Sequence, residues 1–235
     1  RFEWQPQESC EKLLREYRLQ CKAAQRVEDI QPSAWSASKL AEWHKALQEW
    51  KGKQKEWKQV LEQLSEWKKE GAKDDEVGKE GSERPTDVDP DELDVFGVQD
   101  INDIGSGEPL YASFANEDWA LLERRFELHL LVHAFRRDLN DPERPMFLER
   151  HLAFYYSRYF KKSLDLEQFG CGANGELLGL LRDTLAVTGS GMLEPQVSED
   201  SPMDHFVRLA EEHRRDRQRS LDAGDETAAL RFRAR

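Results

Sequence analysis

The chain has 235 residues, of which 35% are charged and 38% are hydrophobic, and its formal net charge is −12 at pH 7. No apolar run approaches the roughly 18 residues that cross a bilayer, so we expect no membrane segment. Three cysteines without a closely spaced pair argue against a disulfide framework or a thiolate zinc site. They favour a reducing, intracellular compartment, either cytoplasmic or nuclear.

The net charge comes from one stretch of the chain. Residues 71–118 hold 3 Lys and Arg against 15 Asp and Glu, a difference equal to the whole net charge. Glycine, proline and clustered acids indicate a flexible acidic linker, which we assign to residues 71–110. Such a segment could instead dock on a basic protein. Asp87, Asp89 and Asp91 begin like a calcium loop, but Glu92 occupies the position that requires glycine, so we expect no calcium site.

Two amphipathic helices are predicted in residues 1–70. The first covers 7–29, and Pro32 then favours a turn before a second helix that Ser36 or Ser38 caps and that runs to about Glu70. A short connection between amphipathic helices predicts an antiparallel, coiled-coil-like hairpin rich in tryptophan.

The second helix carries tryptophans at seven-residue intervals: Trp43, Trp50 and Trp57. This spacing places them on one helix face, and we expect Lys53 and Gln54 to interrupt the apolar seam. The first helix is too short to cover the whole face, so Trp43 and Trp50 are expected to close the hairpin. The predicted partner-binding residues are Trp50, Trp57, Leu61, Leu64 and Trp67.

Residues 111–235 are predicted to form a bundle of four to five helices, with no strand of useful length. Trp119–Leu139 is apolar nearly all round, as expected for a central helix. Asp141-Pro142 and Ser201-Pro202 both resemble helix starts. The remaining predicted helices cover about 142–162, 177–187 after Asn174, 202–221, and a short last turn after Asp225. The predicted fold class is therefore all-α.

Three histidines suggest a candidate metal site. His129 and His133 are four residues apart on one helix, and His151 on the next predicted helix could approach them. The sequence between them lacks the glutamate of a His-Glu-x-x-His protease, so we favour histidines of a helical core and expect no bound metal.

Gly170, Gly172 and Gly175 match the G-x-G-x-x-G spacing of a dinucleotide site, with Cys171 between them. The motif requires a preceding strand, which the pattern does not indicate here, so we predict a glycine-rich turn and no cofactor. A reactive Cys171 thiol at a helix start is the alternative to an inert cysteine.

Two segments interleave cations with aromatic or acidic residues and could contact nucleic acid. Aromatic rings stack on bases and cations contact phosphates, although aromatics at helical spacing more often form a core. The candidate residues are Tyr155, Arg158, Tyr159, Lys161, Lys162, Arg214, Arg215 and Arg217.

The leading functional hypothesis is a non-catalytic interaction or scaffold module that docks a partner protein through its Trp-lined helix. The alternatives are a nucleic-acid-associated regulator and a metal-dependent enzyme built on His129, His133 and His151. The chain begins at Arg1 rather than Met, which we expect of a fragment of a longer protein. The pattern leaves the oligomeric state open.

Overall fold

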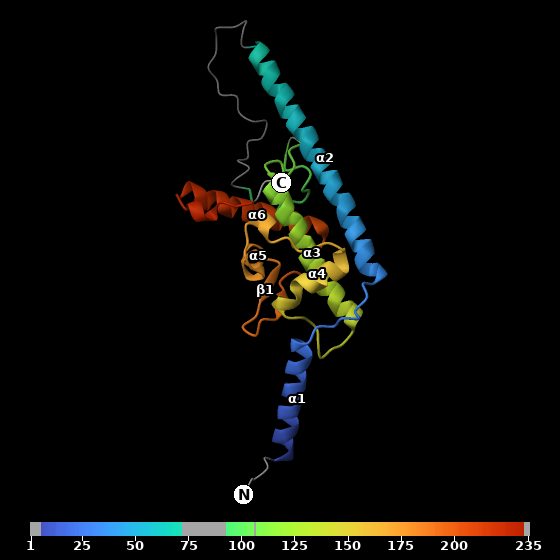
Figure 1. Cartoon of the computed structure of the whole chain (residues 1–235). Helices are drawn as coiled ribbons and strands as arrows, with labels where there is room; N and C mark the ends of the chain where they lie inside the picture. Colours follow the sequence, from blue (N-terminus) through green and yellow to red (C-terminus); the bar gives the residue numbers. More distant parts are fainter. Residues whose placement is uncertain (1–5, 72–92, 106, 233–235) are drawn as a thin grey trace. The chain divides into compact units, whose positions relative to one another are not determined.

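The described chain is mostly helical, which confirms the predicted mainly α-helical class. The computed structural model describes residues 6–71, 93–105 and 107–232, and within them it contains six α-helices and one two-stranded sheet (Figure 1). None of the described helices has the length and apolarity that crossing a bilayer requires. The centre of the predicted acidic linker, including Asp87, Asp89 and Asp91, lies outside the described residues.

The chain forms two compact units, and the boundary between them falls inside two of its helices. Unit 1 comprises residues 1–40, 125–200 and 231–235. Unit 2 comprises residues 41–124 and 201–230.

Helix α1, Gln7–Ala24, belongs to unit 1 and has no buried residue. It ends five residues earlier than predicted, because Gln25 has an extended backbone and the guanidinium groups of Arg144 and Arg150 bond the carbonyls of Gln25 and Ala24. Its apolar side chains are uncovered, since Leu13 and Tyr17 are 61% and 64% exposed. The structure therefore does not confirm the predicted Trp-rich hairpin, in which these side chains would be buried.

Helix α2, Ala34–Gly71, is 38 residues long and thus spans about 57 Å. Its composition of Ala, Leu, Lys, Glu and Gln has high helix propensity, which suits a helix with a long solvated face. Its N-terminal half in unit 2 is packed, with Trp43, Leu47 and Trp50 buried.

Helix α3, Asn116–Leu139, includes the whole predicted helix and starts three residues before it. The Asp118 carboxylate accepts a hydrogen bond from the backbone N–H of Ala115, which satisfies one of the unpaired donors at the helix start. Asn140 has a left-handed backbone, with φ 48°, and ends the helix. Residues 124–135 are all buried, which agrees with an apolar pattern that covers most faces of the helix.

The helix predicted over residues 142–162 does not form in the first half of that range. The Asp141 carboxylate accepts a bond from the Glu143 N–H, but no helix follows, because Pro145 disfavours helical backbone at Arg144. A 3-10 turn η1, Glu149–His151, leads instead into α4, Leu152–Phe160. The core of unit 1 forms around Phe135, Phe147 and Tyr155, whose ring centroids lie 4.6–4.9 Å apart.

The predicted helix over residues 177–187 is replaced by a shorter helix and a strand. Helix α5, Asn174–Leu180, follows the 3-10 turn η2, Glu167–Phe169. Strand β1, Leu185–Val187, then pairs antiparallel with β2, Leu193–Pro195. The two strands are joined through Gly191, whose φ of 78° suits a tight turn. The expectation that no strand forms was therefore wrong for this short hairpin.

Helix α6, Met203–Asp222, agrees with the predicted helix over 202–221, and the predicted last turn is η3, Glu226–Ala228, which the Asp225 carboxylate caps. Residues 93–110 were assigned to the linker, yet they carry buried side chains of unit 2. Val95, Ile101 and Leu110 are 2–4% exposed. Apolar burial, which a linker lacks, places this stretch in the folded unit.

Candidate interaction surface

One face of α2 carries an apolar seam that continues past the packed part of the helix. Residues recur in alternating steps of four and three, which keeps them on one side of a helix. The seam consists of Trp43, Leu47, Trp50, Gln54, Trp57, Leu61 and Leu64. Its first four members are buried, Trp57 is half-buried, and Leu61 and Leu64 are 46% and 39% exposed.

The buried half of the seam packs inside unit 2. The Trp43 ring meets Trp50 edge-on at 5.6 Å between centroids and Phe206 of α6 at 6.3 Å. Trp50 in turn lies 6.4 Å from Tyr111. Trp50 is only 8% exposed, so its predicted role in partner binding is wrong: its surface is already used within the chain.

Gln54 belongs to the seam and does not interrupt it, contrary to the prediction. It is 7% exposed, and its amide N–H₂ lies 2.8–3.1 Å from the carbonyl oxygens of Tyr111, Ala112 and Phe114. Its carbonyl oxygen accepts a bond from Trp119 Nε1 at 3.0 Å. Lys53, by contrast, is exposed beside the seam. A polar residue is accommodated here because the backbone of residues 111–114 presents carbonyl oxygens to it.

Beyond Trp57 the described apolar side chains of α2 face solvent. We call the four exposed residues the distal α2 face: Val60, Leu61, Leu64 and Trp67, with exposed fractions of 43%, 46%, 39% and 74%. At 100° per residue these positions fall within about 120° of one another around the helix. Three of them were predicted as partner-binding residues, and Val60 was missed although its spacing to Leu64 signals it. The distal α2 face is thus an apolar stripe of the width that a docked helix covers.

The aromatic residues proposed to stack on nucleic-acid bases are part of the unit 1 core. Tyr155 and Tyr159 are 0% and 8% exposed, so a stacking role for either is wrong. The Tyr155 hydroxyl accepts a bond from the Val27 N–H, and the Tyr159 hydroxyl donates to the Asp138 carboxylate. Burial and Asp138 raise the pKa of Tyr159, which keeps this hydroxyl protonated.

The neighbouring cations are mostly paired within unit 1. Arg158 donates to the carbonyl of Ile30 at 3.0 Å, and Lys162 lies 2.5 Å from the fully buried Glu127 carboxylate. Lys161 is exposed at the end of α4. One exposed lysine does not make the multi-cation track that binds a phosphate backbone.

The second basic segment, on α6 in unit 2, is also paired. Glu211 is 2% exposed and bonds Arg214 at 2.7 and 2.8 Å and Arg215 at 2.7 Å. Arg217 bonds the buried Asp118 at 2.7 Å. A polar cavity of about 340 Å³ lies here, lined by three carboxylates and two guanidinium groups among its residues. This charge balance does not favour a phosphate.

The histidines do not form the suggested metal site. His129 and His133 have ring centroids 4.5 Å apart, but no arrangement of the described residues brings ligand atoms of His129, His133 and His151 within 4.8 Å of one another. His133 Nε2 lies 3.2 Å from the Val197 carbonyl, and burial lowers its pKa. Burial and the nearby Arg150 and Arg144 lower the pKa of His151, and those cations would repel a metal ion.

The glycine-rich turn lacks the strand of a dinucleotide site, because it follows η2. The Gly172 N–H donates at 2.6 Å to the Glu176 carboxylate, which occupies the place a phosphate would need. Burial and Glu176 raise the pKa of the Cys171 thiol, which disfavours the thiolate form that a nucleophile requires.

Comparison of the chain with protein-family models, curated proteins and solved structures gives no match.

Proposed function

We propose that this chain is a non-catalytic interaction module that docks an amphipathic helix of a partner protein on the distal α2 face. The observation that carries the proposal is the exposure of Val60, Leu61, Leu64 and Trp67 as one stripe on a helix whose other seam residues are buried or half-buried. Soluble proteins seldom leave large apolar side chains contiguous and uncovered unless another surface covers them.

The magnitude of the stabilisation supports a specific contact. Complete burial of an exposed aliphatic side chain contributes about 1.5–3 kcal/mol, so the half-exposed Val60, Leu61 and Leu64 would contribute about 1 kcal/mol each. Trp67 is 74% exposed and, as a large aromatic, is the residue most able to act as an anchor. A helix with i, i+3, i+4 apolar residues is the partner that fits a straight stripe of this kind.

The candidate chemical residues support a non-catalytic role. Cys171, His129, His133 and most of the basic residues that the sequence pattern singled out are buried or ion-paired within the two units. The distal α2 face, by contrast, offers four exposed apolar side chains to a partner.

The test compares partner capture by the wild-type chain with capture by Leu64→Gln/Trp67→Gln. The matched control is Glu62→Gln/Glu66→Gln, which changes exposed residues on the opposite side of the same turns. Quantitative mass spectrometry should show specific proteins lost by at least tenfold from the first variant and retained by the control, with equal thermal stability for all three proteins. Identical capture by all three would refute the proposal.

A further inference from the structure

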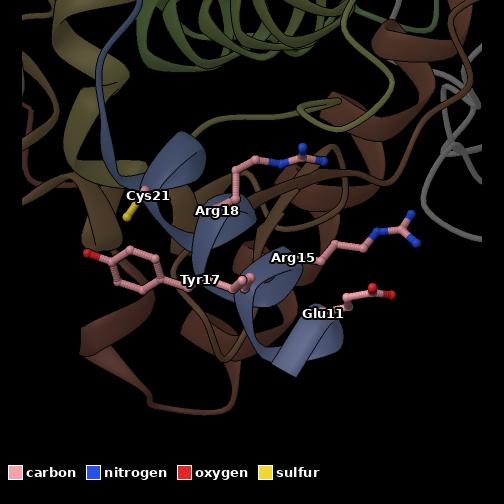
Figure 2. A pocket seen from close by; sticks show the side chains of 6 residues that line it. Glu11, Arg15, Tyr17, Arg18 and Cys21 are labelled. Atoms are coloured by element: carbon pink, nitrogen blue, oxygen red, sulfur yellow. The ribbon is translucent and has the colours of Figure 1, made fainter. Parts of the chain in front are cut away.

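Helix α1 carries a second uncovered apolar face, with a regular pattern. Alternating steps of four and three residues connect Cys10, Leu14, Tyr17, Cys21 and Ala24, which makes them the a and d positions of a coiled-coil seam. Leu14 and Tyr17 at its centre are 66% and 64% exposed. They form a shallow groove with Cys21 and three flanking residues: Glu11, Arg15 and Arg18 (Figure 2).

The C-terminal end of α1 is held against unit 1. Lys22 bonds Asp141 at 3.1 Å and Glu143 at 2.7 Å, and Arg150 donates to the Ala24 carbonyl at 2.7 Å. Leu14 and Tyr17 are not packed against the described part of unit 1, since they are 66% and 64% exposed. Because most of the stability of a helix in a protein comes from packing of its amphipathic face, burial of this seam would stabilise α1.

We infer that the seam of α1 binds the same helix of a second copy of this chain, in antiparallel orientation. An antiparallel coiled coil places each a residue opposite a d residue of the other helix. Centring the pair between Leu14 and Tyr17 sets Leu14 against Tyr17 of the second copy. The same register sets Cys10 against Cys21 of the second copy, so the two small residues meet at both ends of the contact.

The flanking charges select this orientation. Glu11 and Arg18 both occupy e positions, and an antiparallel pair brings e positions opposite one another. In this register Glu11 faces Arg18 of the second copy, and Arg18 faces Glu11. A parallel pair would instead set Arg18 against Leu13, which occupies a g position, and would lose both ion pairs.

In the single chain the apolar and the charged side chains of this groove lie on different sides of α1 (Figure 2). Tyr17 and Cys21 point to one side of α1, while Glu11, Arg15 and Arg18 point to the other (Figure 2). Arg18 also bonds Glu143 at 2.5 Å. A guanidinium has five N–H donors, so this bond leaves others for the second copy.

The two cysteines provide a test that reports orientation. Within one chain Cys10 and Cys21 are eleven residues apart on one helix, about 16 Å, which a short bismaleimide does not bridge. The full-length chain is treated with such a reagent and separated under denaturing conditions. An antiparallel dimer gives a covalent dimer with wild type and none with Cys10→Ser or Cys21→Ser alone, and mixing the two single variants restores the product.

A parallel dimer would react differently, since each single variant would still join its remaining cysteine to the same cysteine of the second copy. That outcome, or a wild-type chain that stays monomeric in sedimentation equilibrium at high concentration, overturns the inference. Cys171→Ser is the matched control and should react like wild type, because Cys171 is buried.

A charge-reversal series gives an independent check. Glu11→Arg should weaken the dimer by at least threefold, because two guanidinium groups then face each other across the contact, and adding Arg18→Glu should restore it. Absence of both effects would contradict the register. All these changes lie on α1, so their failure leaves the proposed role of the distal α2 face untouched.

Discussion

Gln54 is the polar residue on which the packing of α2 in unit 2 depends. Its side chain makes three hydrogen bonds to the carbonyls of residues 111–114 and accepts one from Trp119 Nε1. Gln54→Leu keeps the side-chain volume and the apolar seam but removes every one of these bonds.

The cost follows from the groups left unpaired. Trp119 Nε1–H and the Phe114 carbonyl belong to buried residues, and each buried polar group without a partner costs about 1–3 kcal/mol. The Tyr111 carbonyl keeps its bond from the Phe114 N–H, and added leucine burial offsets part of the cost. We therefore expect Gln54→Leu to lower the free energy of unfolding by about 2–4 kcal/mol, or Tm by about 10 °C for a chain of this size.

Urea unfolding followed by tryptophan fluorescence measures the effect, with Lys53→Leu as the matched control. Lys53 is the exposed neighbour, so its replacement should change the free energy of unfolding by less than about 0.5 kcal/mol. Equal stability of Gln54→Leu and wild type would refute the reasoning, because it would mean that Gln54 is solvated and that the seam is interrupted there after all.

Three further predictions concern other parts of the molecule. Trp67→Ala should leave Tm within about 2 °C of wild type but weaken partner binding at least tenfold in a titration. If Tm also falls, Trp67 stabilises the folded chain and does not act only in binding. Burial lowers the pKa of His133, so below pH 6.5 the unfolded chain binds more protons than the folded chain. The contribution of His133 to the free energy of unfolding should be complete above that pH and fall as the pH drops toward 5. His133→Gln should flatten this profile in urea titrations at several pH values. The fully buried Arg125 bonds Asp183 at 2.7 and 3.1 Å, so Asp183→Asn should destabilise unit 1 by about 3 kcal/mol in thermal unfolding. The double variant Arg125→Met/Asp183→Asn should recover part of that loss, because it also removes the buried charge. If it recovers nothing, an uncompensated buried charge is not the cause.

The helices that sequence patterns identified well are those with strong local signals. Residues 119–139 and 202–221 combine apolar periodicity with good helix formers, and both form helices within three residues of the predicted bounds. The two main errors share a cause. Pro145 and the pairing of β1 with β2 redirect segments whose apolar spacing alone suits a helix.

The spacing of Trp43 through Leu64 is enough to place them on one face of a long helix, because this depends only on helix geometry. Whether each of them is buried depended on segments far away in the chain. Gln54 looked like an interruption because nothing near it in sequence indicates the carbonyls of residues 111–114 that it bonds.

The same reason explains why the sequence did not indicate the ion pairs of the basic residues. Composition identified Arg214, Arg215 and Arg217 as cations, but their pairing with the buried Glu211 and Asp118 is decided by packing. Local spacing thus determined which side chains lie together on one helix. Which of those side chains another part of the chain covers follows from the packing of the folded units, because burial depends on contacts between residues distant in sequence.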